Sequence, residues 1–343
     1  MTNIEWTDKT WNPIIGCSKL SAGCQNCYAV TMANRLSHNP STPQYAGLTR
    51  SATTWAGTTR LVESELTKPL KWKRGCRIFV GSMTDLFHDA TRDEWIDRVF
   101  AVAALCPQHT FQILTKRPAR MLEYFTKPHR PGQFLTVLDG GEIIDTPSAS
   151  VRAHSAMCDL LPTVPGDVLN RAVRLIDERD GDGDGFIRRW PLPNVWLGVT
   201  VENQEAANGR IPLLLKTPSA KRFISVEPMI GPIDLFHIKD PFYEDNPEYS
   251  GLLLSTGHRL TFNSLIRKPG LADHGQALDW VIAGAETGPR KRPMEHAWAL
   301  ELRDQCTLMR TAFFFKKGSD GSRELDGQRW GQFPGAPMKI AAE

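Results

Sequence analysis

Six short apolar runs recur along the chain, and each of them ends in polar or small residues. They lie at 77–85, 110–116, 194–202, 222–227, 279–286 and 312–316. Strands of a parallel sheet that is covered on both faces are typically continuous apolar runs rather than alternating ones. The pattern therefore predicts six buried strands of a parallel sheet.

Helical patterns lie between these runs. Residues 92–106 and 295–306 carry apolar side chains at helical spacing, and Pro107 directly follows the first segment. Strands that alternate with helices are typical of βαβ units, so we expect an α/β fold that forms a complete or partial (β/α) barrel. In such barrels the chemistry lies where strands end and the following loops begin.

Two stretches, 128–192 and 238–277, interrupt this alternation with Pro, Gly and acidic residues. We expect one barrel domain over 1–343 that carries both stretches as irregular insertions, with a helix around 166–177. Residues 180–185 alternate Asp and Gly like the first half of a calcium loop. Pro191 stands where a complete loop has Glu, so an acidic turn is the preferred interpretation.

The composition is that of an ordinary globular protein. Hydrophobic residues make up 41% and charged residues 23% of the chain. The formal net charge of +3 is too small to indicate nucleic-acid binding by itself. The chain opens without a signal peptide and has no apolar run of about 18 residues, so we expect a cytoplasmic protein without a membrane span.

Three of the seven cysteines, Cys17, Cys24 and Cys27, lie close together. In a reducing compartment such a cluster indicates metal binding or catalysis before it indicates disulfides. Gly16 and Gly23 favour a loop around the thiols, and the run after Cys27 is predicted to be a helix. The dipole at a helix N-terminus stabilises thiolates and a net-negative cluster.

Three closely spaced thiolates leave one iron of a [4Fe–4S] cluster without a protein ligand, and a substrate or S-adenosylmethionine can coordinate there. The first alternative is a structural zinc site with His38 as the fourth ligand, although His38 is further away in sequence than is usual for such sites. Unligated thiols are the second alternative. The remaining cysteines are expected to be buried packing residues: Cys76, Cys106, Cys158 and Cys306.

The cysteine region resembles the start of the phage-associated three-cysteine-motif family of unknown function. The segments that carry the resemblance are Trp11–Ala29, Gly81–His88, Ile113–Pro118, Gly198–Asn203, Ser225–Pro228, Gly284–Gly288 with Arg292 and Pro293, and Phe313–Lys316. That family is similar to the radical S-adenosylmethionine enzymes. The resemblance implies a radical-type barrel that reductively cleaves S-adenosylmethionine to a 5′-deoxyadenosyl radical, with a reductant such as flavodoxin or ferredoxin.

The chain departs from the usual radical-enzyme pattern in three features. The cysteine spacing is six and two residues instead of three and two, and the aromatic residue Tyr28 follows the last cysteine instead of preceding it. The usual Gly-Gly-Glu after the second strand is replaced by residues 81–85. A literal Gly-Gly-Glu at 140–142 falls inside the first insertion.

Polar residues at the predicted strand ends would bind S-adenosylmethionine, if it is the cofactor. Ser82 and Asp85 would accept its amino group, and Lys116 beside Thr115 would meet its carboxylate. The residues expected around the ribose are Thr200, Glu202 and Asn203, with Ser225 and Glu227 nearby. Glu286 and Lys316 would face the substrate as catalytic residues.

These strand-end residues also have simpler interpretations. Each of them could cap a helix or form an ion pair instead. A ring of uncompensated carboxylates in a barrel mouth would be costly, however, and would require a cation, cluster or ligand.

Basic segments follow several of these strands or precede them. They are Lys68–Arg77 with Trp72, Lys116 and Arg117, Arg120, and Arg290–Arg292. Such segments suit phosphate contacts with base stacking, which favours a nucleic acid or nucleotide as substrate, although solvated helix faces look the same. Two other functions stay open: a zinc- or cluster-containing nucleic-acid-binding protein without catalysis, and a carboxylate-based metal-dependent hydrolase.

Overall fold

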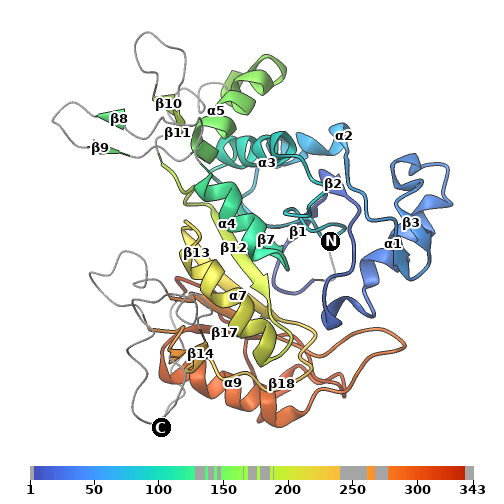
Figure 1. The fold of residues 1–343 in the computed structure, drawn as a ribbon, viewed down its shortest axis with the longest axis vertical. Helices are drawn as coiled ribbons and strands as arrows, with labels where there is room; N and C mark the ends of the chain where they lie inside the picture. The colour runs from blue at the N-terminus through green and yellow to red at the C-terminus, as the bar shows by residue number, and fades with distance from the viewer. Residues whose placement is uncertain are drawn as a thin grey trace, which may run out of the picture. The chain divides into compact units, whose positions relative to one another are not determined.

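The structure is a computed structural model, and it divides into two compact units. It describes residues 4–127, 136–137, 143–144, 148–164, 166–168, 176–177, 186–187, 189–239, 261–266 and 277–336. The first unit comprises Met1–Lys19, Ala29–Trp196 and Thr217–Ala220, and the second comprises Leu20–Tyr28, Leu197–Lys216 and Lys221–Glu343. Figure 1 shows the course of the chain through these parts.

The strands of the first unit are parallel. They are β1 (Lys9–Trp11), β6 (Arg77–Val80) and β7 (Thr110–Thr115). Thr10 of β1 pairs with Phe79 of β6, and Phe79 is also opposite Gln112 of β7. The predictions of strands at 77–85 and 110–116 are confirmed, whereas β1 is too short for its pattern to be recognised.

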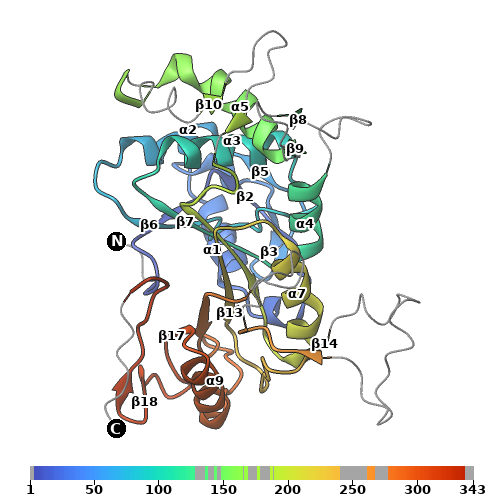
Figure 2. The ribbon, with the colours of Figure 1, turned by 90° about the vertical axis from the view of Figure 1, so that its left-hand side faces the viewer.

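Helices cover the strands of the first unit, beginning with α3 (Asp93–Leu105) and α4 (Pro118–Thr126). Helix α3 packs against α5 (Ser148–Leu160), and Figure 2 shows the two helices side by side. Phe100 lies 5.7 Å from the ring of Tyr124 and 5.4 Å from that of Phe125, between ring centroids. Further helices are α1 (Tyr28–Ser37), which starts at the last residue of the 20–28 segment, and α2 (Glu63–Leu66).

The second unit has the same layered construction. Strand β12 (Val195–Thr200) begins in the first unit and continues into the second, where β13 (Lys221–Val226), β16 (Trp280–Ala283) and β17 (Ala312–Phe315) follow it. Pairing is parallel from β13 to β16 and from β16 to β17. Helix α7 (Gln204–Lys216) contacts β13, and α9 (His296–Leu308) contacts β17 (Figures 1 and 2).

The seven main strands have the order β1-β6-β7-β12-β13-β16-β17. All six predicted strands are present in it, and the fold is a mixed α/β fold with helices between parallel strands. The order has two ends, β1 and β17, so within the described residues the strands do not form a closed ring. The prediction of an α/β sheet is confirmed in this coarser form.

Short two-stranded pairs complete the described chain. They are β2 (Ile14–Ile15) with β5 (Arg60–Leu61), β3 (Thr49–Ser51) with β4 (Thr54–Trp55), β8 (Thr136–Val137) with β9 (Ile143–Ile144), β10 (Ile176–Asp177) with β11 (Phe186–Ile187), β14 (Ile238–Lys239) with β15 (Thr261–Phe262), and β18 (Glu324–Leu325) with β19 (Gln328–Arg329).

Both predicted insertions are described only in parts. The helix expected over 166–177 does not reach its predicted end, because Ile176 and Asp177 form strand β10. The glycine pair at 140–141, Glu142 and the acidic stretch at 180–185 lie outside the described residues. Among the helices that are described, none combines the length and the apolar character that crossing a membrane requires.

Candidate functional site

The segment that carries Cys17 is fastened to the turn after β6. The Gly16 amide donates to the Met83 carbonyl at 3.1 Å, and the Thr84 hydroxyl donates to the Gly16 carbonyl at 2.6 Å. Gly16 has a φ of +97°, and a Cβ atom there would lie 2.3 Å from the Thr58 carbonyl oxygen. Only glycine fits this position, which fixes the backbone directly before Cys17.

Asp85 is the centre of a buried hydrogen-bond network at the ends of β6 and β7. One carboxylate oxygen accepts the Thr115 hydroxyl at 2.6 Å and the Phe87 amide at 3.1 Å. The other accepts the Lys116 amide at 2.9 Å and the Arg117 guanidinium at 3.1 Å. A carboxylate offers about four lone-pair sites, and all four are used here. Asp85 therefore has no acceptor left for the amino group of S-adenosylmethionine.

Arg117 extends this network to Ser18, the residue after Cys17. Its Nη2 donates to Ser18 Oγ at 2.8 Å, and His88 Nε2 lies 2.8 Å from the same oxygen. The Ala90 amide donates to His88 Nδ1 at 3.0 Å, so a neutral ring carries its proton on Nε2 and donates it to Ser18. Burial and the Arg117 charge lower the pKa of His88, which keeps the ring neutral.

Arg117 also supplies a positive charge to Cys17. Burial disfavours the charged guanidinium, but the carboxylate of Asp85 and the negative charge of a Cys17 thiolate raise the pKa of Arg117. Arg117 is therefore a positively charged neighbour of Cys17.

The segment that carries Cys24 belongs to the second unit and is held first by Glu202. The Ser21 hydroxyl donates to Glu202 Oε1 at 2.6 Å, and Arg210 donates to Oε2 at 2.9 Å. A Cβ atom at Gly23 would lie 2.2 Å from Glu202 Oε1, so this glycine permits the close approach. The turn Ala22–Cys24 is a 3-10 helix that rests on this carboxylate.

The other end of the segment is held by Glu286. Asn26 Nδ2 donates to Glu286 Oε2 at 3.1 Å and to the Arg290 carbonyl at 2.8 Å. Arg292 donates to both carboxylate oxygens, at 2.6 and 2.9 Å. Burial raises the pKa of Glu286, but the hydrogen bonds from Arg292 and Asn26 outweigh it and lower the pKa to about 2. Helix α1 begins at Tyr28, directly after Cys27.

Glu227 and Lys316 form an ion pair at the ends of β13 and β17. Gly284 lies against both: a Cβ atom there would be 3.3 Å from Lys316 Cβ and 3.8 Å from Glu227 Cδ. The residues predicted to act on substrate and cofactor are thus brought together here as a pair. Both side chains keep an exposed fraction of 18%, which leaves them accessible.

The remaining predicted cofactor residues have structural roles. Asn203 accepts the Ala206 amide at 3.0 Å and so caps α7. The Ser82 hydroxyl donates to Asn12 Oδ1 at 3.1 Å. Ser225 is buried in β13, and Thr200 is buried at the end of β12 with its carbonyl bound by an arginine side chain. The interpretation of helix caps and ion pairs therefore describes much of this predicted set.

The predicted carboxylates at the strand ends of the second unit are compensated by basic side chains. Each carboxylate at a strand end of the second unit has a basic partner: Glu202 has Arg210, Glu227 has Lys316 and Glu286 has Arg292. The charges are balanced by side chains from helix α7, from the end of β17 and from the loop after β16. The charges of these three carboxylates are therefore balanced by the protein's own side chains.

The three clustered cysteines form no disulfide bond, and their side chains are partly exposed. Cys17 belongs to the first unit and Cys24 and Cys27 to the second. Within the described residues, no group of three or more His, Cys, Asp or Glu side chains is arranged to hold a metal ion. Cysteine thiolates are the usual protein ligands of iron–sulfur clusters, so the donor type, though not a formed site, suits such a cluster.

The other cysteines differ in exposure, and His38 contacts helix α1. Cys106 and Cys306 are buried, as predicted, but Cys76 is partly exposed and Cys158 is exposed. His38 directly follows α1, and its Nδ1 lies 2.7 Å from the carbonyl oxygen of Asn34, a residue of that helix.

Sequence reasoning missed the residues that connect the cysteines to the strand ends. They are Ser18, Ser21, Asn26, His88 and Arg210. The Ser21 and Glu202 pair spans 181 positions, and local patterns carry no information about such a contact. The available signal was the location of Ser18, Ser21 and Asn26 beside the cysteines.

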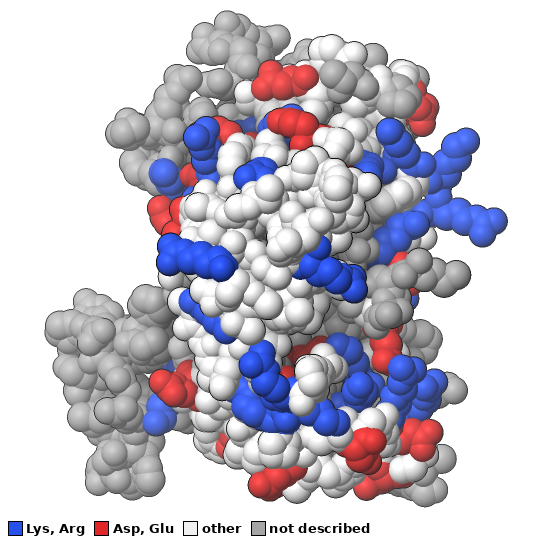
Figure 3. Space-filling model, turned by 90° about the vertical axis from the view of Figure 1, so that its right-hand side faces the viewer, with Lys and Arg blue, Asp and Glu red and all other residues white. Residues whose placement is uncertain are grey.

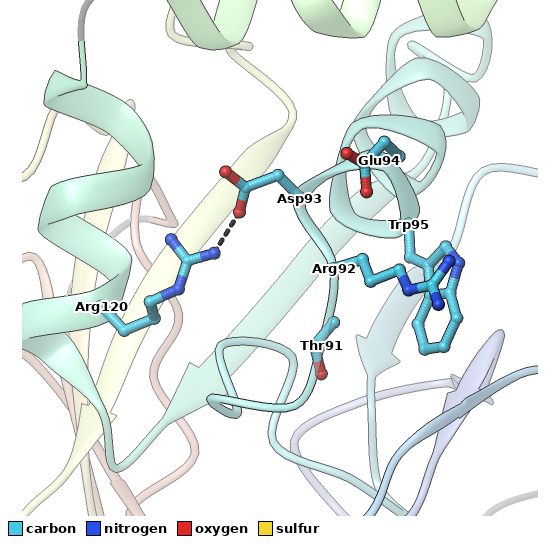
Figure 4. Close-up of a pocket in the computed structure, with 6 residues that line it drawn as sticks. All are labelled: Thr91, Arg92, Asp93, Glu94, Trp95 and Arg120. Atoms are coloured by element: carbon cyan, nitrogen blue, oxygen red, sulfur yellow. Dashed lines mark hydrogen bonds and ion pairs between the residues drawn. The ribbon is translucent and has the colours of Figure 1, made fainter.

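Each unit also has an open hollow in its surface. The hollow in the first unit, drawn in Figure 4, has a volume of about 550 Å³ and is lined by Thr91–Trp95 and Arg120. Arg120, predicted to contact phosphate, points at Asp93 and forms an ion pair with it. The hollow in the second unit has a volume of about 610 Å³ and includes residues of α7 and α9.

Comparisons with curated proteins and with solved structures find no match for the chain. A family model described as a protein of unknown function (DUF5131) matches residues 1–334. This match spans almost all of the 343 residues and agrees with the expected likeness to a family of unknown function. The chain belongs to the DUF5131 family of proteins of unknown function.

Proposed function

We propose that the chain is a radical S-adenosylmethionine-type iron–sulfur enzyme whose [4Fe–4S] cluster is held by Cys17, Cys24 and Cys27. One observation carries the proposal: in each unit, residues beside the cysteines are bonded to side chains that follow the strand ends. Arg117 holds Ser18 in the first unit, and Glu286 holds Asn26 in the second. The ends of parallel strands are where α/β proteins carry their chemistry.

The cluster, when bound, supplies the electron for reductive cleavage of S-adenosylmethionine and takes it from a donor such as flavodoxin or ferredoxin. The protein's own residues prepare the ligands. Arg117 places a positive charge near Cys17, and Cys27 directly precedes helix α1. Lys116 is the candidate for the carboxylate of S-adenosylmethionine, because its ammonium group makes no hydrogen bond or ion pair among the described residues.

A nucleic acid or nucleotide is the proposed substrate class. Arg290 and Lys291 are exposed, and the Arg290 carbonyl accepts a hydrogen bond from Asn26, so basic side chains flank the segment that carries Cys27. Figure 3 shows Lys and Arg gathered in the lower part of the face that it draws. Exposed cations attract phosphate groups. The pair of Glu227 and Lys316 would face the substrate.

The carboxylate-based hydrolase has less support. A metal-dependent hydrolase needs carboxylates with oxygens available to the metal ion. In the second unit these oxygens are already bonded to arginine or lysine, as in the pairs of Glu202 with Arg210 and Glu286 with Arg292.

Anaerobic purification with iron and sulfide analysis tests the proposal. We expect brown protein with about four irons per chain. The variants Cys17→Ala, Cys24→Ala and Cys27→Ala should each lose most of the iron, whereas the control Cys158→Ala should keep it. Colourless protein with one zinc per chain would contradict the cluster and favour the zinc alternative.

The radical step has its own test. The reduced, iron-loaded protein is incubated with S-adenosylmethionine, and we expect 5′-deoxyadenosine to form. Loaded protein that yields none would show a cluster without this reaction, which would favour the non-catalytic alternative.

A further inference from the structure

We propose that Glu202 and Glu286 are positioning residues that hold the segment 20–28 in place before any metal binds. This inference rests on the proposed function for its purpose, because the segment carries two of the three cluster ligands. The two carboxylates act on Cys24 and Cys27 indirectly, through hydrogen bonds to Ser21 and Asn26 of the same segment. They are accordingly not ligands of S-adenosylmethionine or of substrate.

Glu202 is the more deeply buried of the two carboxylates. It is 2% exposed, and Arg210 orients it by bonding both its Oε2, at 2.9 Å, and the Thr200 carbonyl, at 2.6 Å. Its Oε1 is thereby directed at Ser21, which donates at 2.6 Å. The absence of a side chain at Gly23 lets the turn lie directly on this carboxylate.

Glu286 holds the segment from the other end. Its Oε2 accepts three donors: Asn26 Nδ2 at 3.1 Å, the Arg292 amide at 2.8 Å and Arg292 Nε at 2.9 Å. The second Asn26 bond, to the Arg290 carbonyl, fixes the orientation of the amide group. Gln25 adds a contact of 3.4 Å with Arg292 Nη1. The carboxylate is ionised at neutral pH, so these are charge-assisted bonds.

The two residues that the carboxylates hold, Ser21 and Asn26, lie close in sequence to both cysteines of the segment. Ser21 and Asn26 lie on either side of Cys24, the Cys24 amide donates to the Ser21 carbonyl at 2.9 Å, and Cys27 follows Asn26. A segment that is not held in place would lose conformational entropy when it binds a metal. Anchoring the segment in the metal-free protein removes part of that cost from the binding step.

Hydrogen exchange of the metal-free, full-length protein tests the proposal directly. The variants are Glu202→Gln and Glu286→Gln, with Glu205→Gln on the exposed start of α7 as the matched control. We expect amides of 20–28 to exchange about tenfold faster or more in both variants, because charge-assisted bonds that close the segment are lost. The control should exchange like the unchanged protein. Unchanged exchange in both variants would overturn the proposal.

Two further readouts separate positioning from a general loss of stability. Alkylation of Cys24 and Cys27 should accelerate in the variants, whereas Cys17, in the first unit, should react at an unchanged rate. Asn26→Ala combined with Glu286→Gln should loosen the segment no more than Asn26→Ala alone, because that change already removes the bond through which Glu286 holds Asn26. Additive effects of the two changes would contradict the assignment.

These experiments stay distinct from the test of the cluster. Loosening of 20–28 in protein that binds no iron would uphold the positioning role and overturn only the proposed function. Conversely, protein that binds about four irons, with variants whose segment exchanges normally, would uphold the proposed function and overturn the positioning role.

Discussion

The segment with Cys17 and the segment with Cys24 and Cys27 are attached to their own units by different kinds of bond. In the first unit, backbone bonds of Gly16 and the buried pair of Asp85 and Arg117 hold the chain beside Cys17. In the second unit, the Ser21 side chain reaches the buried Glu202, and the Asn26 side chain reaches Glu286, whose basic partner Arg292 is 25% exposed.

The order of one segment depends on the whole core of its unit, and the order of the other depends on a few local bonds. Buried ion pairs and backbone bonds inside a core break only when that core unfolds, whereas contacts near the surface open in smaller fluctuations. Cys17 should therefore be as ordered as the first unit itself. Cys24 and Cys27 depend on local bonds that can be removed singly.

The largest effect is expected for Arg117→Met, which leaves the buried Asp85 carboxylate without its cation. Removing one partner of a buried ion pair costs about 3–5 kcal/mol, so the free energy of unfolding should fall by that amount in denaturant titrations. Arg98→Met is the control, because its partner Glu63 is 65% exposed. That variant should lose less than about 1 kcal/mol. Equal losses would show that the two pairs do not differ as their burial indicates.

A smaller loss, about 1–3 kcal/mol, is expected for Gly16→Ala. Alanine is strained at a φ of +97° and would collide with the Thr58 carbonyl. Gly23→Ala meets only the Glu202 side chain, so it should lower the unfolding free energy less while loosening the segment around Cys24. Thermal unfolding measures the first effect and hydrogen exchange the second. The reverse ranking of the two glycine variants would contradict the stated difference between the two cysteine segments.

The next largest effect on the unfolding free energy is expected from mild acid, through His88 of the first unit. Burial and Arg117 lower the pKa of His88 below its ordinary value of 6.5, so the unfolded chain binds the proton more readily than the folded one. The contribution of His88 to the free energy of unfolding is therefore complete above pH 6.5 and declines as the pH falls below that value. The decline should be weaker in His88→Gln, measured as unfolding free energy against pH. An equal decline would assign it to other groups.

The smallest effect near neutral pH is expected from the acid titration of Glu286. Its pKa is lowered from 4.5 to about 2, so its contribution is present above pH 4.5 and is lost only as the pH falls towards 2. Exchange protection of 20–28, corrected for intrinsic rates, should therefore persist through the range in which His88 titrates. Loss of protection near pH 6 would contradict the low pKa of Glu286.

Much of the fold could be predicted because buried parallel strands leave long apolar runs. The run at 110–116 corresponds closely to β7, Thr110–Thr115, and the helical pattern at 92–106 to α3. Strand β1 was missed because three residues show no periodicity. Helix α7 was missed because Pro212 and Gly209 weaken its pattern, while its packing on β13 stabilises it.

The site was predictable only in part, for a different reason. Strand ends can be located from sequence, so Asp85, Glu202 and Glu286 were found as polar residues at those ends. Their roles depend on partners far away in the chain, such as Asn26, which lies 260 positions from Glu286. A carboxylate that is free for a ligand and one that is already bonded look identical in sequence.

The course of the chain through the two units has a practical consequence. Each unit is assembled from separate stretches, and the chain passes from one to the other after Lys19, Tyr28, Trp196, Lys216 and Ala220. No single cut in the polypeptide or its gene yields either unit whole. Fragments ended at any of these points would part strands and helices from the cores they complete, so truncation and domain exchange are poorly suited to this protein, whereas point substitutions are well suited.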